Sequence, residues 1–202
     1  SLTPEGRDYL ERARRILADV DEAETVLVAG QAEPQGTIKV TAPVRFGQMH
    51  VAPGLIELAR RHPKISVDLV LLDRVVDLVD EGFDASIRLA PLADSSMVAI
   101  PVGDVSRLTV ASPTLLESVG PPGTPAAFAD LPCVRFSGTS PGDLWTFERG
   151  KSREQVPVSG AFRSNDAASA IDACVAGVGF GQFLSYQVAP ALADGRLVEV
   201  LE

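Results

Sequence analysis

Four short segments of this chain place charged or hydroxyl side chains where a strand is expected to end: residues 41–46, Asp73, residues 137–140 and residues 164–166. In an open α/β sheet, small molecules bind beyond the carboxyl ends of the strands, and helix N-termini there attract anions. The segments therefore predict a small-molecule site, although a proline turn, helix caps and a solvated loop are the simpler interpretations. The ligand-binding candidates are Thr41, Ala42, Pro43, Val44, Arg45, Phe46, Asp73, Arg88, Ser137, Gly138, Thr139, Asn165 and Asp166.

Arg88 ends an otherwise apolar segment, residues 84–89. A guanidinium in that position is either a clamp for a carboxylate ligand or half of a structural ion pair. Asp84 and Asp94 are neighbours that could complete such a pair. Because structural pairing is the commoner fate of such a group, both interpretations stay open.

No motif for catalysis, a metal or a cofactor passes its spacing test. Residues 150–152 end like a phosphate-binding loop, but Trp145, itself expected in the core, stands where that loop needs glycine. Residues 177–181 are rich in glycine, yet they follow an expected helix and precede a strand, the reverse of a dinucleotide site. His50 and His62 have no partner at metal-binding spacing, and no Gly-x-Ser-x-Gly elbow occurs. We therefore expect no catalytic residue, no cofactor and no metal.

The composition is that of a globular protein whose cysteines are expected to stay reduced. The chain has 202 residues, of which 46% are hydrophobic and 22% are charged, and no apolar run could span a bilayer. Cys133 and Cys174 lie far apart in apolar surroundings, so we expect buried free thiols and a cytoplasmic location. The net charge of −9 argues against a surface that grips nucleic acid.

The N-terminal segment is expected to form one long helix that Thr3 caps and Gly30 ends. Its apolar positions follow the alternating three- and four-residue spacing of a coiled-coil seam, widened by one row. These dimerisation candidates are Tyr9, Leu10, Ala13, Ile16, Leu17, Val20, Ala23 and Leu27. So narrow an apolar stripe on a highly charged helix suits a partner helix better than a broad core.

Strands and helices are expected to alternate after the polar linker at residues 31–36, which predicts parallel pairing and an open α/β sheet. Strands are expected at residues 37–42, 65–72, 84–89, 97–103, 106–111, 133–136, 145–147, 155–158, 178–183 and 197–201. Helices are expected at residues 49–61, 74–81, 114–119, 125–129, 166–176 and 186–193. The pattern also predicts a break at residues 43–47, Asp73 as the cap of the second helix, Ser164 or Asn165 as the cap of the fifth, and a hairpin around residues 148–151.

Several segments together resemble the LysR-type transcriptional regulators. They are residues 2–6 (Leu-Thr-Pro-Glu-Gly), 39–47 (Lys-Val-Thr-Ala-Pro-Val-Arg-Phe-Gly), 84–88 (Asp-Ala-Ser-Ile-Arg), 110–113 (Val-Ala-Ser-Pro), 136–138 (Phe-Ser-Gly), 177–180 (Gly-Val-Gly-Phe) and 195–198 (Gly-Arg-Leu-Val). They follow the family's order and cover essentially the whole chain.

The resemblance implies an α/β, two-lobed type II periplasmic-binding-protein-like fold preceded by a long linker helix. Residues 1–30 would hold the end of the winged domain and the dimerisation helix, 37–104 the first lobe, 105–194 the second lobe, and 195–202 a strand crossing back to the first. The winged helix-turn-helix is absent, and the family would continue for a few dozen residues past Glu202. The implied function is to bind a small-molecule effector, for which a carboxylate fits Arg88, in the cleft between the lobes.

Three classes of function remain in competition. The resemblance favours the effector-sensing, oligomerising part of a cytoplasmic regulator that forms homodimers or homotetramers and contacts DNA only through the absent module. A free-standing solute-binding protein of the same fold is the alternative, and it would need a secretory leader or lipid anchor. An enzyme is the weakest candidate, because no motif supports one. No membrane contact is expected.

Overall fold

The N-terminal helix begins as predicted. The computed structural model describes residues 33–74, 76–89, 98–138, 143–150 and 152–201, together with Thr3, Gly6, Tyr9, Arg12 and Ala13. The last four of these are helical, and the Thr3 hydroxyl accepts a hydrogen bond from the Gly6 amide at 3.1 Å, which confirms Thr3 as the N-cap. The remaining predicted dimerisation residues lie outside the described residues: Leu10, Ile16, Leu17, Val20, Ala23 and Leu27.

Internal contacts divide the chain into two compact units. One comprises Ser1–Ile38 and Leu55–Asp68, and the other comprises Lys39–Gly54 and Leu69–Glu202. Every predicted ligand-binding residue belongs to the second unit.

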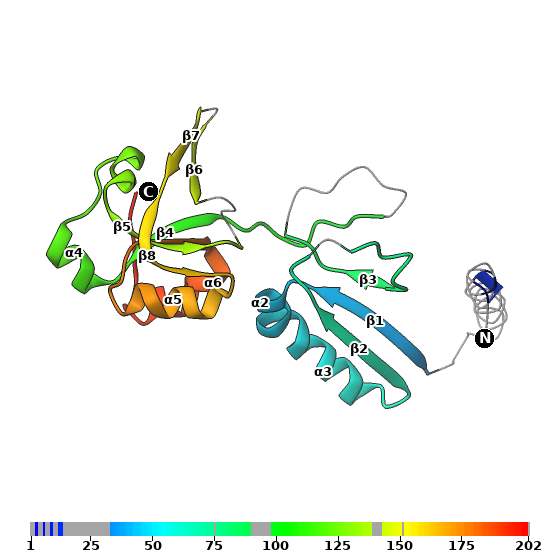
Figure 1. Cartoon of the computed structure of the whole chain (residues 1–202). Helices are drawn as coiled ribbons and strands as arrows, with labels where there is room; N and C mark the ends of the chain where they lie inside the picture. Colours follow the sequence, from blue (N-terminus) through cyan, green and yellow to red (C-terminus); the bar gives the residue numbers. More distant parts are fainter. Residues whose placement is uncertain are drawn as a thin grey trace. The chain divides into compact units, whose positions relative to one another are not determined.

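A three-stranded sheet holds the first strands of the chain, in the order β2-β1-β3 (Figure 1). β1 covers Gly36–Ala42, β2 covers Ile65–Leu71, and β3 covers only Ala85–Ser86. β1 and β3 run parallel, with Val40 opposite Ala85 and Thr41 opposite Ser86. Val40 and Ala42 are buried, as the alternating apolar pattern of this strand predicts.

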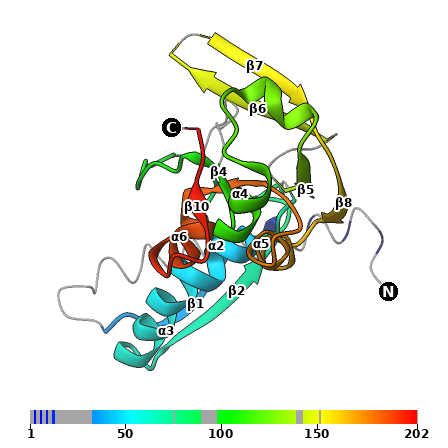
Figure 2. The ribbon, with the colours of Figure 1, turned by 90° about the vertical axis from the view of Figure 1, so that its left-hand side faces the viewer.

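One continuous helical segment follows β1 and begins at Val44 instead of residue 49. The short helix α2 (Val44–Phe46) passes through a π-helical turn, η1 (Gly47–Val51), into α3 (Ala52–Arg61), which runs beside β2 in Figures 1 and 2. The predicted break at residues 43–47 was therefore wrong. Pro43 is extended and takes the N-cap position, and Gly47 fits inside the helix because the Leu71 side chain fills the space a β-carbon would need.

The predicted helix over residues 74–81 was also wrong. Residues 78–82 form a turn, and the Asp77 carboxylate accepts hydrogen bonds from the amides of Val79 at 2.9 Å and Asp80 at 3.0 Å. An aspartate that bonds its own following amides offers the backbone an alternative to a helix, which explains the error. Gly82 ends the turn with a φ of 67°.

The remaining elements form three further small sheets and the helices around them. In chain order they are β4 (Arg107–Ala111), α4 (Pro113–Val119), the 3₁₀ turn η2 (Pro125–Ala129), β5 (Pro132–Phe136), β6 (Leu144–Arg149), β7 (Ser152–Pro157), β8 (Ser159–Ser164), α5 (Ala167–Val175), β9 (Gly181–Leu184), α6 (Ser185–Ala193) and β10 (Val198–Glu199). The sheet orders are β10-β4-β9, β5-β8 and β6-β7. β6 and β7 are antiparallel, which confirms the predicted hairpin.

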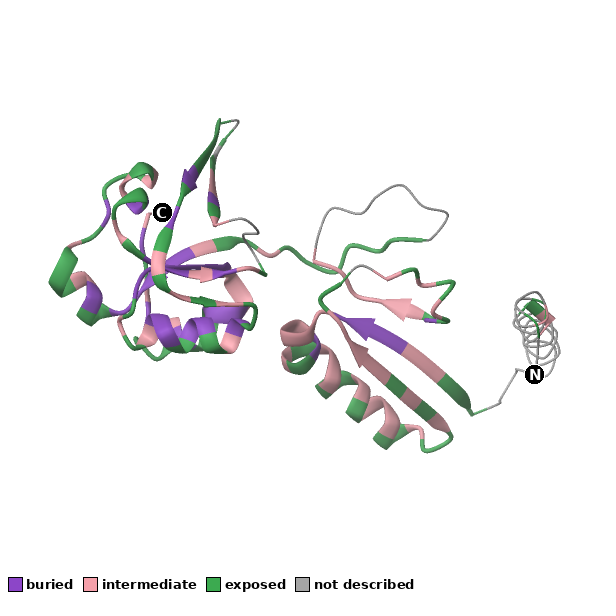
Figure 3. Ribbon diagram, viewed as in Figure 1, coloured by how far each residue is buried: buried purple, intermediate pink, exposed green. Residues whose placement is uncertain are grey.

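Most of the fully buried side chains belong to the elements from β4 onward, and Thr41 and Ala42 of β1 are fully buried as well (Figure 3). One cluster packs α5 and α6 against β4, β5 and β9, and it includes Cys174 and Phe183. A second cluster gathers Phe128, Trp145 and Phe180, with ring centroids 5.1 and 5.4 Å from Phe128. Trp145 is a packing residue, as predicted, and both cysteines are buried free thiols.

Four further expectations differ from the structure. Residues 98–103 form no strand, and β8 appears where none was predicted. The cap of α5 is Asp166 instead of Ser164 or Asn165. β10 is shorter than predicted and pairs antiparallel with β4, Val198 opposite Ala111. No described helix has the length and apolar character that crossing a bilayer requires.

Candidate functional site

A cavity of about 580 Å³ opens among the loops that follow β1, β2, β3, β5, β8 and β9, within the second unit. Its size lies in the range that small-molecule sites occupy. It is lined by Pro43, Val44, Arg45, Gln48, Leu72, Asp73, Arg74, Arg88, Leu89, Phe136, Ser137, Gly138, Asn165, Asp166, Ala167, Ala168, Leu184, Tyr186 and Gln187. The fold thus brings strand-end segments that lie far apart in the sequence to one cavity, as the rule that ligands bind beyond strand ends predicts.

Asp73 fixes the start of α2. Its Oδ1 accepts a hydrogen bond from the Val44 amide at 2.9 Å, across 29 residues of sequence. The first amides of a helix have no partner within it, so this carboxylate satisfies one of them from another loop. Asp73 is therefore a helix cap, as its simpler interpretation held, but of a different helix from the predicted one.

Arg45 and Arg88 each carry a buried N–H group without a partner. The Nε of Arg45 and one terminal nitrogen of Arg88, Nη2, are shielded from solvent and make no hydrogen bond to any residue that the structure describes. Among the described residues neither guanidinium forms an ion pair. Asp84, one structural partner considered for Arg88, instead accepts a bond from the Lys39 amide at 2.7 Å, and Asp94, the other, lies outside the described residues. Burial lowers the pKa of Arg88, the charge of Arg74 lowers it further, and Glu81 opposes both. A buried donor without a partner is costly, so each arginine is suited to bind an acceptor from outside.

Two buried hydroxyl groups lie beside this pair on the sheet. Thr41 and Ser86 stand opposite each other on β1 and β3, and neither side-chain oxygen has a hydrogen-bond partner. Arg88 follows two residues after Ser86, in the segment after β3. Thr41 itself does not line the cavity, and neither do Ala42 and Phe46, although all three were predicted binding residues.

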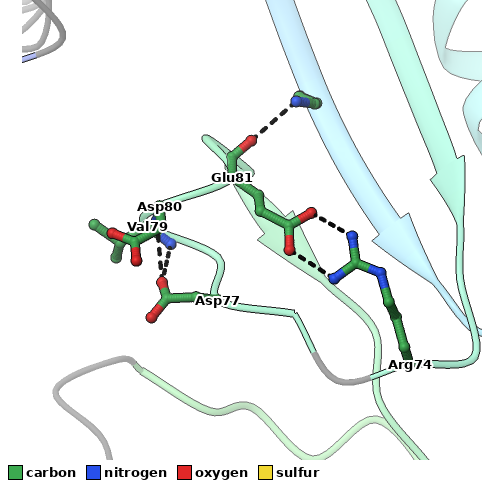
Figure 4. A network of polar contacts seen from close by, with 6 residues as sticks. Arg74, Asp77, Val79, Asp80 and Glu81 are labelled. Atoms are coloured by element: carbon green, nitrogen blue, oxygen red, sulfur yellow. Dashed lines mark hydrogen bonds and ion pairs between the residues drawn. The ribbon is translucent and has the colours of Figure 1, made fainter. Parts of the chain in front are cut away.

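Arg74 also lines the cavity, but its charge is already matched. Both of its terminal nitrogens bond the Glu81 carboxylate at 2.8 Å, as Figure 4 shows. The Glu81 backbone carbonyl in turn accepts a bond from Lys39 Nζ at 2.9 Å. The turn that carries Glu81 is thus tied to the sheet and to Arg74. The pairing holds the pKa of Glu81 below its usual value.

The N-terminal end of α5 supplies the opposite wall. Asp166 accepts hydrogen bonds at 2.8 Å from both the amide and the hydroxyl of Ser169, and these bonds lower the pKa of its carboxyl. Ser137 and Asn165 line the cavity beside it, as predicted, while Thr139 lies outside the described residues. Asp166 is therefore the cap of α5, and its role in binding a ligand stays a prediction.

Tyr186, at the start of α6, is the main lining residue that the sequence did not predict. Its ring meets Phe46 edge-on, with centroids 5.2 Å apart, and lies 5.7 Å from His50. Strand β9 precedes this helix just as β8 precedes α5, so the strand-end rule applied there too would have found it. Phe46 does not line the cavity, but its ring packs against the ring of Tyr186.

The lining combines charged, polar and apolar groups. It holds three arginines, the carboxylates of Asp73 and Asp166, several amide and hydroxyl groups, and the apolar surfaces of Leu72, Phe136 and Tyr186. Within the described ranges, no three histidine, cysteine, aspartate or glutamate side chains come together as a metal site would require.

Comparison with known proteins identifies the family. The family model for the LysR substrate binding domain matches residues 31–202. An HTH-type transcriptional repressor of Pseudomonas aeruginosa is 32% identical over 203 residues, 100% of this chain and 64% of that protein. The HTH-type transcriptional regulator DmlR of Escherichia coli is 30% identical over 202 residues, 100% of this chain and 66% of that protein. The chain therefore spans about two thirds of these relatives.

Solved structures give the same fold. CrgA, a LysR-type transcriptional regulator from Neisseria meningitidis, superimposes with a TM-score of 0.72 at 27% identity, over 100% of this chain and 68% of CrgA. Full-length AphB, a virulence activator of Vibrio cholerae, superimposes with a TM-score of 0.74 at 22% identity, over 100% of this chain and 69% of AphB, a likeness that concerns the fold alone. The predicted fold class is confirmed.

Proposed function

The chain belongs to the LysR substrate-binding domain family, and we propose that its cavity binds the small-molecule effector of a DNA-binding transcriptional regulator. One observation carries the proposal: two arginines of the cavity, Arg45 and Arg88, each have a buried N–H group that finds no partner within the described part of the chain. A carboxylate is the acceptor that a guanidinium binds best, since its two oxygens match the fork of donors. We therefore propose that Arg88 is a carboxylate clamp.

The effector would act by favouring one arrangement of the elements around it. A ligand held by Arg45 in α2 and by the start of α5 contacts parts of the chain that are more than a hundred residues apart. Any ligand that binds one arrangement better than another shifts the population toward it. We propose that this shift, passed to DNA-binding domains, is the regulatory signal.

A thermal-shift screen of small carboxylates and neutral metabolites tests binding. A ligand present at a hundred times its dissociation constant adds about 2.7 kcal/mol to the free energy of unfolding, which a melting curve resolves easily. We expect an acid among the hits, and Arg88→Gln to remove most of its shift. Arg107→Gln is the matched control, because Arg107 is exposed on β4 and does not line the cavity. A library without any stabilising compound would refute the binding function, and an unchanged shift in Arg88→Gln would refute the clamp.

Self-association and DNA binding complete the proposed regulator. We propose that the seam of residues 9–27 pairs two copies of the chain, and that a helix-turn-helix module, which the relatives' names include, contacts DNA in the cytoplasm. The proposed lobes are residues 37–104 and 105–194, with 195–202 returning to the first. Sedimentation should show a dimer or larger assembly that Ile16→Asp combined with Val20→Asp weakens. A monomer at high concentration would contradict pairing through this segment.

The relatives are transcriptional regulators, and we propose that this chain likewise has no enzymatic activity. Its cavity offers donors for an anion and no nucleophile that a neighbouring base activates. Incubation of the purified chain with each ligand from the screen should leave the ligand chemically unchanged. Turnover of a ligand would overturn this conclusion.

A further inference from the structure

The three arginines of the cavity differ in what already binds them. Arg74 is held by both oxygens of Glu81 at 2.8 Å. In the part of the chain that the structure describes, Arg45 and Arg88 pair with no carboxylate, and each keeps a buried donor unsatisfied. The cavity thus presents two available cations and one that is neutralised in advance.

The two acids of the lining make no hydrogen bond to Arg45 or Arg88 among the described residues, although the charge of Arg45 helps the bonds from Ser169 to lower the pKa of the Asp166 carboxyl. Asp73 is occupied by the Val44 amide at 2.9 Å, and Asp166 by Ser169 at 2.8 Å. Both carboxylates serve as helix caps, a role that fixes their oxygens on backbone amides. The lining acids therefore leave the buried donors of both arginines free.

We propose that the cavity recognises a compact small molecule with two acidic groups, one bound by Arg45 and the other by Arg88. The inference rests on the proposed effector-binding function and names the chemical class of that effector. The two arginines come from different elements, α2 and the segment after β3, so each presents its own fork of donors. A cavity of about 580 Å³ has room for a ligand that reaches both.

Glu81 limits the number of acidic groups that the cavity recognises to two. It binds Arg74 through both oxygens (Figure 4), so a third acidic group entering the cavity meets an arginine whose charge is already matched. The charge of Arg74 lowers the pKa of Arg88 and that of Glu81 raises it, so both groups of the pair act on the same part of the cavity. Without the Glu81 charge, Arg74 would be a third available cation.

Matched pairs of acids test the two-site recognition. Malonate, succinate, glutarate and adipate are compared by calorimetry and thermal shift with propionate, butyrate, valerate and caproate, which have the same carbon chains and one acid fewer. We expect the best dicarboxylate to bind at least about tenfold more tightly than its monocarboxylate partner, the contribution of one charge-assisted interaction. Arg45→Gln and Arg88→Gln should each abolish that advantage, and Arg107→Gln should keep it.

The outcomes distinguish the two-acid inference from the proposed effector-binding function. Monocarboxylates that bind as tightly as their partners would overturn the two-acid class. So would a screen in which only neutral or singly charged compounds bind, although the cavity would still be an effector site. If no compound of any class binds, the proposed function itself fails.

A second comparison tests the part of Glu81. Glu81→Gln keeps the size of the side chain and removes its charge, so it should increase the affinity for tricarballylate relative to glutarate by about fivefold, as one further exposed charge contact would. Asp77→Asn is the matched control, because Asp77 lies on the same turn and bonds only backbone amides among the described groups. Circular dichroism checks that both variants are folded. A ratio that stays unchanged in Glu81→Gln would show that Glu81 does not set the limit.

Discussion

Asp73 offers the sharpest test of how the cavity is built, because its hydrogen bond and its charge make separable contributions. Its Oδ1 accepts the Val44 amide at 2.9 Å and so caps the helical segment that runs from α2 through η1 into α3. Replacing a capping side chain by alanine costs about 0.5–2 kcal/mol, and about 1 kcal/mol is the value we expect for Asp73→Ala, since the residue is exposed. Asp73→Asn keeps an acceptor oxygen and should cost less than half as much.

The assay must report on the helix itself. Chemical denaturation followed by far-UV circular dichroism does so, whereas fluorescence of the only tryptophan, Trp145, reports on the aromatic cluster around Phe128. Both Asp73 variants also remove a negative charge from a cavity that we propose binds an anion, so dicarboxylate binding should tighten up to about fivefold in each.

Two results would refute this reasoning about Asp73. An equal loss of stability in Asp73→Ala and Asp73→Asn would mean that the charge, and not the hydrogen bond, supports the helix. Weaker binding in both variants would mean that Asp73 contacts the ligand, the interpretation that the sequence left open.

Three further predictions concern the core and the wall of the cavity. Phe128→Ala should lower the free energy of unfolding by about 3–5 kcal/mol, because Phe128 is fully buried among three aromatic rings; tryptophan fluorescence during denaturation measures it, and a loss under about 1 kcal/mol would contradict the packing. Burial raises the pKa of the Cys133 thiol to about 12 and also raises that of Cys174, so neither should react with a disulfide reagent at pH 8 until the protein is unfolded, when both should; rapid reaction of the native protein would contradict this. The bonds from Ser169 lower the folded-state pKa of Asp166, so its contribution to stability is complete above about pH 4 and is lost as the pH falls through the lowered value. Asp166→Asn should therefore flatten the acid side of the stability profile, and an unchanged profile would show that these bonds contribute little.

The elements that the sequence predicted well are those whose signals are local. The alternation of Ile38, Val40 and Ala42 placed β1 within one residue of its observed bounds. The small apolar residues after Asp166 placed α5 similarly well. Periodicity of this kind depends only on which face of an element is buried, so it can be recognised without knowledge of the neighbours.

The errors arose where a distant residue decided the local structure. Pro43 and Gly47 look like a break, yet a helix starts between them because Asp73 caps it and Leu71 fills the space beside Gly47. Residues 74–81 have a helical pattern, but Asp77 bonds the following amides and produces a turn. Sequence rules for caps and turns consider neighbours along the chain, and they cannot anticipate a cap that comes from 29 residues away.

The sequence alone determined the family, the α/β class and the principle that ligand contacts follow strand ends, because motif order and apolar periodicity are written along the chain. Only the tertiary structure decided which charges are available. Arg45, Arg74 and Arg88 are the same residue type, and Arg74 and Arg88 have acidic neighbours in the sequence whereas Arg45 has none within ten residues. The turn at residues 78–82 brings Glu81 to Arg74, while the acids near the other two serve backbone amides. Pairing depends on distances of a few ångströms between groups from different elements, and folding alone sets those distances.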